Sequence, residues 1–380
     1  MGLRRWLALV VTLSLLALAV AWAEPAQPGD GEAARLCLAT AEVNLLDPGV
    51  GWLRPSPDYL DGNWLRDAFW TTSALGTRIG WRALEHFGSQ LSPAGQAPTR
   101  LGPDGLGNQY FDDESTLLYF LWAYRDGGQS PGRLAKSWGW VRRHVTAGGY
   151  WTPAGGFRTW HDSFVFPTDD VSAYNQGLYA AAALAAARLG LADAAEAEAA
   201  VGFYRYLYRP GLGYLPFSLK FAYRDASALV GEVLARSLLG RSLLDDAAVL
   251  ATVEHLPRAG PGFRVLTAPD GAYLPLAAFT PNFLPGVYQN GGSWLLYDVL
   301  AWQAAALAGS APAKAAGRER LAFEVARGSL YEYWTTSDAG LLRGERRDYA
   351  WNAYACPALG VAGVPSKVRE QRWLSLPVPY

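Results

Sequence analysis

The sequence predicts an all-α protein with an (α/α)6 barrel, in which six helical hairpins form a single ring. Apolar residues recur with helical spacing along most of the chain, and very apolar segments alternate with segments that have a polar face. Six times an Asp or Asn, with aromatic or polar neighbours, stands just before an apolar helical run. These are Asp67, Asp113, Asp170, Asp225, Asn290 and Asp348. The repetition predicts that loops at one end of the ring converge on a pocket.

The two kinds of helical segment predict an inner and an outer ring. Helices that are apolar around their whole circumference are buried on both sides, so the inner ring is expected to include residues 115–122, 178–189 and 293–307. The segments with a polar face are expected outside, at 32–46, 79–88, 131–146, 192–209, 243–256 and 313–329. The expected total is about twelve helices in six pairs.

The N-terminus has the pattern of a secretory signal. Arg4 and Arg5 precede an apolar run over residues 6–20, and Ala21 and Ala23 are the small residues that signal peptidase requires. We expect residues 1–23 to be a cleaved signal peptide and residues 24–380 to form one barrel domain, secreted or held in the periplasm or cell envelope. An uncleaved anchor is the alternative, although the apolar run is shorter than the roughly 20 residues of a spanning helix. No later segment is expected to cross a membrane.

Composition narrows the expected partners. The formal net charge of −1 and the absence of a Lys/Arg cluster argue against nucleic acid. Sixteen Trp and twenty Tyr exceed what packing requires, and flat amphipathic rings stack on sugars while their polar edges bind hydroxyls. The sequence therefore favours a carbohydrate partner, even though many of these rings simply fill space between helices.

The cysteines and histidines give two further expectations. Cys37 lies on the first expected helix and Cys356 on the last; a closed ring would make these neighbours, so they form either a disulfide or two buried thiols. The four histidines are scattered and form no cluster with cysteine. We therefore expect no metal and no cofactor.

Four short motifs carry a family resemblance. The first is Trp64-Leu65-Arg66-Asp67, and the second is Trp160-His161-Asp162 followed by a helix that contains Asn175 and Gln176. The third is Gln289-Asn290 with Trp294, and the fourth is Glu332 with Trp334 and the later Trp351. In this order the chain resembles the six-hairpin glycosidases: glucoamylases, the glucosidase part of glycogen-debranching enzymes, processing α-glucosidases and glucosylglycerate hydrolases.

The resemblance implies a sugar pocket. Arg66 and Asp67 would bind hydroxyls of the terminal sugar, which suits a guanidinium and a carboxylate acting together. The other expected substrate-binding residues are Trp64, Asp113, Trp160, His161, Asn175, Gln176, Asp225, Gln289, Asn290, Trp294, Trp334 and Trp351. Three features depart from the family pattern: His161 replaces a Met, Asn175-Gln176 stand where a carboxylate is common, and Gln289 replaces a His.

The reaction expected from the resemblance is glycosidic hydrolysis with inversion. It needs one protonated carboxyl for the leaving oxygen and one ionised carboxyl to activate water, about 6.5–9.5 Å apart. We expect Asp162 to be the acid, with a pKa raised because Trp160 and Phe164 exclude water. Glu332 is expected to be the base, kept ionised by hydrogen bonds. Asp225, Asp169 and Asp170 are the alternative acids.

Other interpretations of the same residues stay open. The six Asp/Asn residues are also the types that cap helices, and this role does not exclude the other. A second function class is a lyase or unsaturated uronyl hydrolase, for which Arg66, Arg158 and Arg224 would bind a uronate. A third is a non-catalytic sugar-binding protein of the cell envelope. We favour a hydrolase that acts on a small or terminal α-glucoside.

Overall fold

The structure is a computed structural model, and it describes residues 29–59, 62–102, 107–111, 114–127, 129–152, 159–167 and 169–361. The expected signal peptide and Asp113 lie outside these residues. Twelve α-helices, α2 to α13, lie within them. None of these described helices is both long and apolar enough to span a bilayer.

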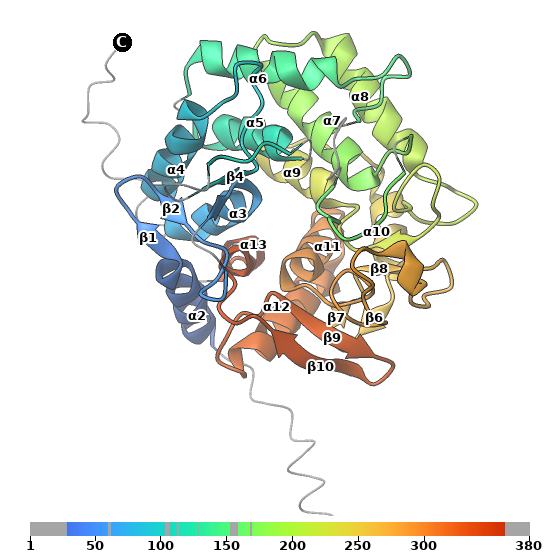
Figure 1. The fold of residues 1–380 in the computed structure, drawn as a ribbon. Helices are drawn as coiled ribbons and strands as arrows, with labels where there is room; N and C mark the ends of the chain where they lie inside the picture. Colours follow the sequence, from blue (N-terminus) through green and yellow to red (C-terminus); the bar gives the residue numbers. More distant parts are fainter. Residues whose placement is uncertain are drawn as a thin grey trace, which may run out of the picture.

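Six of the helices are largely buried and follow one another in space. They are α3 (Leu65–Leu75), α5 (Ser115–Asp126), α7 (Ala173–Arg188), α9 (Val230–Leu239), α11 (Leu295–Leu307) and α13 (Ala355–Leu359). Each packs on the next, and α13 returns to α3, with the 3-10 helix η2 (Ala350–Tyr354) also against α3. The contacts therefore run in a closed circle (Figure 1).

The other six helices lie around the outside of this circle (Figure 1). They are α2 (Asp30–Val43), α4 (Thr77–Ser89), α6 (Pro131–Arg143), α8 (Ala194–Leu207), α10 (Asp246–His255) and α12 (Ala311–Val325). They fall in the six segments that the sequence assigns to the outer ring. The inner assignments fall on α5, α7 and α11 and are largely buried, so the alternation of apolar and half-polar runs predicted correctly which of these helices are buried.

Small residues allow the inner helices to approach closely. Residues 180–183 of α7 are all alanine and are fully buried. Where α7 meets α9, a Cβ on Gly231 would stand 2.0 Å from the carbonyl carbon of Gly177. Any side chain at Gly231 would therefore push the two helices apart, which explains why glycine occupies the crossing.

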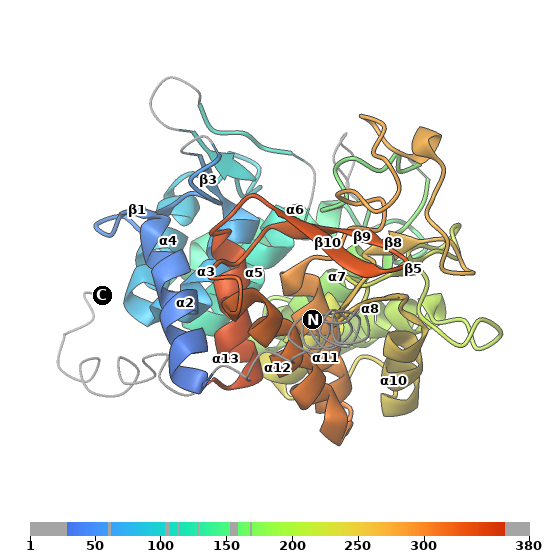
Figure 2. The same ribbon diagram turned by 90° about the horizontal axis from the view of Figure 1, so that it is seen from below.

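Short antiparallel strand pairs, which the all-α prediction lacks, connect the helices. They are β1 (Leu45–Asp47) with β2 (Trp52–Leu53), β3 (Asn63–Trp64) with β4 (Arg100–Leu101), β5 (Arg224–Asp225) with β8 (Leu266–Thr267), β6 (Arg258–Ala259) with β7 (Gly262–Phe263), and β9 (Tyr333–Ser337) with β10 (Gly340–Glu345). Figure 2 shows β3, β5, β8, β9 and β10 gathered at one end of the helices. Another 3-10 helix, η1 (Leu276–Ala278), lies in the long loop before α11.

The two cysteines form a disulfide. Cys37 of α2 and Cys356 of α13 are bonded, with their Cα atoms 6.3 Å apart and 319 positions between them in the sequence. The bridge joins the first and last described helices, so the circle is closed covalently as well as by packing. Of the two alternatives left by the sequence, the structure has the disulfide.

Within the described residues, Asp67, Asp170, Asp225 and Asn290 do not act as N-caps. In α3, α5, α9 and α11 no side chain caps the first turn, and α7 is capped by Ser172, whose Oγ accepts from the N–H of Asn175 at 3.2 Å. Asp170 instead binds the backbone N–H groups of Val171 and Lys220, at 2.8 and 3.0 Å. Asp170 stands ahead of the start of α7. Its carboxylate therefore links the loop before α7 to the loop that contains Lys220.

Candidate active site

One pocket at the loop end contains half of the predicted site residues. It is lined by Pro55, Tyr59, Trp64, Arg66, Asp67, Trp160, Asp162, Tyr288, Trp294, Glu332, Tyr349 and Trp351. Its empty volume, which includes the open mouth, is about 370 Å³. Eight of these residues were predicted from the sequence, and they come from segments scattered over most of the chain.

Backbone pairing brings these segments together. Leu65 donates its N–H to the carbonyl of Thr99 at 3.0 Å, which fixes the start of α3. Ser293 and Trp334 exchange two backbone hydrogen bonds, of 2.9 and 2.8 Å. This exchange holds the β9–β10 hairpin, which follows Glu332, beside the loop that carries Trp294.

Glu332 is buried and bound through both carboxylate oxygens. The hydroxyl of Tyr59 donates to Oε1 at 2.9 Å, and Arg346 donates from Nη1 to Oε2 at 2.7 Å. Burial raises the pKa of Glu332 to about 7, against the opposing effects of the Arg346 charge and the Tyr59 hydrogen bond. Hydrogen bonds were expected to keep Glu332 ionised. They do lower its pKa, but the loss of water around the buried carboxyl raises the pKa by more.

Asp162 lies at the solvent-facing mouth of the same pocket. Its Oδ1 accepts from Nε2 of Gln289 at 3.0 Å and from the hydroxyl of Tyr288 at 3.5 Å. Desolvation by the surrounding protein raises its pKa, while the charge of Arg66 and the Gln289 hydrogen bond lower it. The residue itself is exposed, so a bound sugar would displace the remaining water and strengthen this effect. Trp160 contributes to these surroundings, but Phe164 does not line the pocket.

Arg66 and Asp67 lie in the first turn of α3 and line the pocket. Arg66 Nη1 lies 3.0 Å from Oε1 of Glu114, whose side chain is buried, and its guanidinium lies 5.1 Å from the centre of a Trp351 ring. Burial raises the pKa of Asp67 to about 6, although the charge of Arg66 and a hydrogen bond from Tyr349 lower it. The pocket therefore holds a fixed cation and a third carboxyl beside the acid and base candidates.

Aromatic rings form a wall of the pocket. Trp294 lies 5.3 Å from Trp160, 5.7 Å from Trp351 and 5.0 Å from Tyr288, measured between ring centroids. Such a surface suits the apolar face of a sugar ring, whose hydroxyls would meet the carboxylates. The combination of three carboxyls with packed indoles is chemistry that suits carbohydrate binding.

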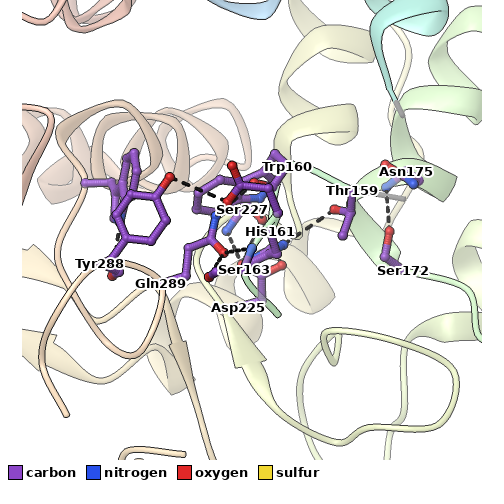
Figure 3. Close-up of polar contacts among 12 residues, drawn as sticks. Thr159, Trp160, His161, Ser163, Ser172, Asn175, Asp225, Ser227, Tyr288 and Gln289 are labelled. Atoms are coloured by element: carbon purple, nitrogen blue, oxygen red, sulfur yellow. Dashed lines mark hydrogen bonds and ion pairs between the residues drawn. The ribbon is translucent and has the colours of Figure 1, made fainter. Parts of the chain in front are cut away.

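Several predicted site residues do not line the pocket. His161 and Asp225 are buried beneath it, with His161 Nε2 3.4 Å from Asp225 Oδ1. Asp225 also accepts from the N–H and hydroxyl of Ser227 at 2.8 Å, and Ser227 in turn accepts from the indole N–H of Trp160 at 2.7 Å (Figure 3). Through Ser227, Asp225 therefore supports Trp160, and neither Asp225 nor His161 lines the pocket where a sugar contact was expected.

The amide residues of the motifs also have structural positions. Gln289 is buried and supports Asp162, while Asn290 is held by Leu274, accepting from its N–H at 3.1 Å and donating to its carbonyl at 3.2 Å. Gln176 is buried in α7 and accepts from the N–H of Trp151 at 3.1 Å. Asn175, in the same turn, is likewise buried and does not line the pocket.

Trp334 and the alternative acids are also placed away from the pocket. Trp334 donates its indole N–H to Glu324 at 2.8 Å, because alternation along β9 turns its ring toward α12. Asp170 is buried and bonded to Ser218 at 2.6 Å, whereas Asp169 is exposed and pairs with Lys220. Asp162 is thus the one acid among the four candidates that lines the pocket.

Sequence reasoning missed several residues of the site. Tyr59, Tyr288 and Tyr349 line the pocket, Arg346 binds the Glu332 carboxylate, and Glu114 binds Arg66. Tyr288 and Tyr349 stand next to predicted residues, so the motifs contained that signal. Tyr59 lies 273 positions from Glu332, and Arg346 lies 14 positions from it. Nothing in the local sequence of either residue indicates contact with the Glu332 carboxylate.

A larger hollow elsewhere lacks this combination. It lies between α6 and α8, has about 540 Å³ of empty volume, and includes Tyr179 and Phe203. Its one carboxylate, Glu196, lies 3.4 Å from Arg142. In the part of the chain that the structure describes, no group of three His, Cys, Asp or Glu side chains could hold a metal ion.

Comparison with known proteins finds similarity in structure alone. No family profile matches the chain, and no curated protein matches by sequence. The GH63 mannosylglycerate hydrolase from Thermus thermophilus, solved in complex with glucose, superposes with a TM-score of 0.58 at 14% identity, over 86% of this chain and 99% of that one. A wild-type glycosidase superposes with a TM-score of 0.58 at 15% identity, over 87% of this chain and 97% of that one. The chain therefore has the fold of these glycosidases, in agreement with the resemblance in its motifs.

Proposed function

We propose that this protein is an inverting glycoside hydrolase, built on an (α/α)6 barrel, that removes a terminal sugar from a small α-glycoside. The observation that carries the proposal is the meeting of Asp162 and Glu332 in one aromatic-walled pocket. Neighbours in structure include glycosidases, and two of these were solved with glucose. α-Glucosides are accordingly the first substrates to test.

In the proposed mechanism Asp162 is the general acid. It gives its proton to the glycosidic oxygen as the bond to the anomeric carbon breaks, so the leaving group departs as a neutral alcohol. Desolvation favours the protonated acid before the reaction. Gln289 and Tyr288 would keep the carboxyl in position, because both bind the same oxygen.

Glu332 is the proposed general base. It takes a proton from water as the water oxygen attacks the opposite face of the anomeric carbon, which inverts the configuration. A pKa of about 7 gives the group both a substantial ionised fraction and a useful basicity near neutral pH. Arg66, Asp67 and the indoles of Trp160, Trp294 and Trp351 would hold the sugar ring.

The uronate alternative finds little support among the arginines it needs. Arg66 lines the pocket, but its charge is already paired with Glu114. Arg224 lies over the ring of Tyr214 and outside the pocket. Arg158 lies outside the described residues.

We also propose export of the protein to an oxidising compartment. The support is the disulfide between Cys37 and Cys356, since such bridges persist mainly in secreted and periplasmic proteins. The N-terminal pattern of residues 1–23 is consistent with this destination.

The proposed reaction can be tested with a panel of aryl α- and β-glycosides of glucose, mannose and galactose. Turnover of an α-glycoside, followed by proton NMR of the first product formed, should show the β-anomer. Release of the α-anomer would contradict inversion, and turnover confined to unsaturated uronates would favour the alternative class. Sugar binding without turnover of any glycoside would contradict catalysis and favour a binding protein.

A further inference from the structure

We propose that Arg346 and Tyr59 are positioning residues that hold Glu332 as an oriented carboxylate. The inference rests on the proposed role of Glu332 as general base, and it concerns two residues that the motifs do not contain. They reach Glu332 from different directions: Arg346 from the turn after β10, and Tyr59 from the loop before α3. Together they bind both oxygens of the carboxylate.

The three side chains form a closed triangle. Tyr59 donates to Oε1 of Glu332 at 2.9 Å, and Arg346 donates to Oε2 at 2.7 Å. Arg346 also donates to the hydroxyl of Tyr59, and its guanidinium lies 4.5 Å from the centre of the Tyr59 ring. Because each member contacts the other two, the carboxylate cannot rotate without breaking a charge-assisted hydrogen bond.

Arg346 binds the backbone of Glu332 as well as its side chain. The N–H of Glu332 donates to the carbonyl of Arg346 at 2.9 Å and to that of Glu345 at 3.1 Å. One residue therefore holds Glu332 at both ends. This arrangement restrains the orientation of the Glu332 side chain as well as stabilising its negative charge.

The backbone at this turn supports a specific role for Arg346. Its φ angle is +51°, in the left-handed region, and Asp348 two positions later has φ of +53°. Glycine or asparagine would adopt this conformation more easily, but neither supplies a guanidinium. A bulky non-glycine residue in this region is a frequent feature of functional sites.

The triangle also counters the groups that favour a protonated Glu332. Burial and the nearby Asp67 carboxylate both act in that direction. Tyr288 and Tyr349 are further titratable groups that face the pocket beside it. Arg346, whose side chain is 43% exposed, is a cation in direct contact with Glu332. Each carboxylate oxygen has about two acceptor sites, so the triangle still leaves a lone pair for the attacking water.

The test is a titration of Glu332 that does not depend on activity. Protein with ¹³C-labelled glutamate carboxyls is followed by NMR across pH, and the Glu332 signal is assigned by its loss in E332Q. Arg346→Met should raise the pKa of Glu332 by about 1–3 units, and Arg346→Lys should restore most of the difference. Tyr59→Phe should raise it less. Arg343→Met is the matched control, because Arg343 lies on the same hairpin, is exposed, and pairs with Glu345 at 3.1 Å.

The outcomes separate this inference from the proposed reaction. If wild-type protein hydrolyses no glycoside but the titration behaves as expected, the triangle stands and the proposed function fails. In an active protein the acid limb of kcat/KM should move upward with the pKa in R346M and stay in place in R343M. Should R346M fail to fold, R346K and Y59F still decide the matter. A Glu332 that titrates alike in wild type, R346M and Y59F, or that shifts equally in R343M, overturns the proposal.

Discussion

Gln289 donates a 3.0 Å hydrogen bond from Nε2 to Oδ1 of Asp162, although the two residues lie 127 positions apart. The amide of Gln289 has no freedom to turn away. Its Oε1 accepts from the N–H of Ser163 at 3.0 Å, and Nε2 also donates to the carbonyl of Trp160 at 2.9 Å (Figure 3). The glutamine thus fixes the turn on which Asp162 stands.

Replacing this glutamine should impair the reaction without abolishing the fold. We expect Gln289→Ala to lower kcat by about 10- to 100-fold, because small displacements of a catalytic group are costly. Gln303→Ala is a suitable control, since Gln303 accepts a 3.1 Å hydrogen bond from Tyr354 away from the pocket. Steady-state kinetics on the best aryl α-glycoside would check this. Equal kcat in the two variants would contradict the role of Gln289 in positioning Asp162.

The pH dependence of activity should follow Glu332 on the acid side. A general base must be ionised, so kcat/KM should fall as the pH drops through about 7, the raised pKa of Glu332. Asp162 must keep its proton in the same reactive state, so deprotonation of Asp162 should also lower kcat/KM. A substrate whose leaving group needs no proton should lose the dependence on Asp162 and keep the dependence on Glu332. An acid limb below roughly pH 5 would mean an unperturbed glutamate, and would contradict the assignment.

Sequence and structure agree best where local pattern determines position. The apolar runs of α5, α7 and α11 could be recognised as inner helices from the sequence, because a helix that is buried on both sides must be apolar around its circumference. Trp64, Arg66 and Asp67 were also found, because one helix start places them together. For these elements the information lies within a few neighbouring residues.

The remaining residues depend on contacts that no local pattern contains. Tyr59 meets Glu332 across 273 positions, and Glu114 meets Arg66 across 48. Asn175 and Gln176 were expected in the site because they stand where the resembled family commonly has a carboxylate, yet both are buried. The β9–β10 hairpin was missed because strand pairing of a short segment gives a weak signal beside strong helical ones.

The disulfide should contribute strongly to stability. It closes a loop of 319 positions between Cys37 and Cys356, and the chain-entropy account gives about 6 kcal/mol for a loop of this length. Urea denaturation of wild type and of a Cys37→Ser/Cys356→Ser variant, each with and without reductant, would measure this. Reductant should destabilise wild type and leave the double variant unchanged. An insensitive wild type would contradict the expected contribution.

The buried charge cluster of Arg320, Asp298 and Glu324 under the β9–β10 hairpin should also contribute strongly to the free energy of unfolding. Arg320 is fully buried and lies 2.7 Å from Asp298 and 2.6 Å from Glu324. Arg320→Met would leave two buried carboxylates without their cation, so we expect a loss of about 3–5 kcal/mol in unfolding free energy.

The matched control for Arg320 lies on the same helix. Arg318 pairs with Asp30 at 3.0 Å, but both side chains are 39% exposed. Arg318→Met should therefore cost less than about 1 kcal/mol. Chemical denaturation of the two variants would compare them, and similar losses would show that burial does not set the difference.

The central claim is that Asp162 and Glu332 act together on one bound sugar. The most direct measurement is kcat for Asp162→Asn and Glu332→Gln, with sugar affinity measured in parallel by calorimetry. Each variant should lose at least about 100-fold in kcat and retain sugar binding. Turnover near the wild-type rate in either variant would contradict the claim.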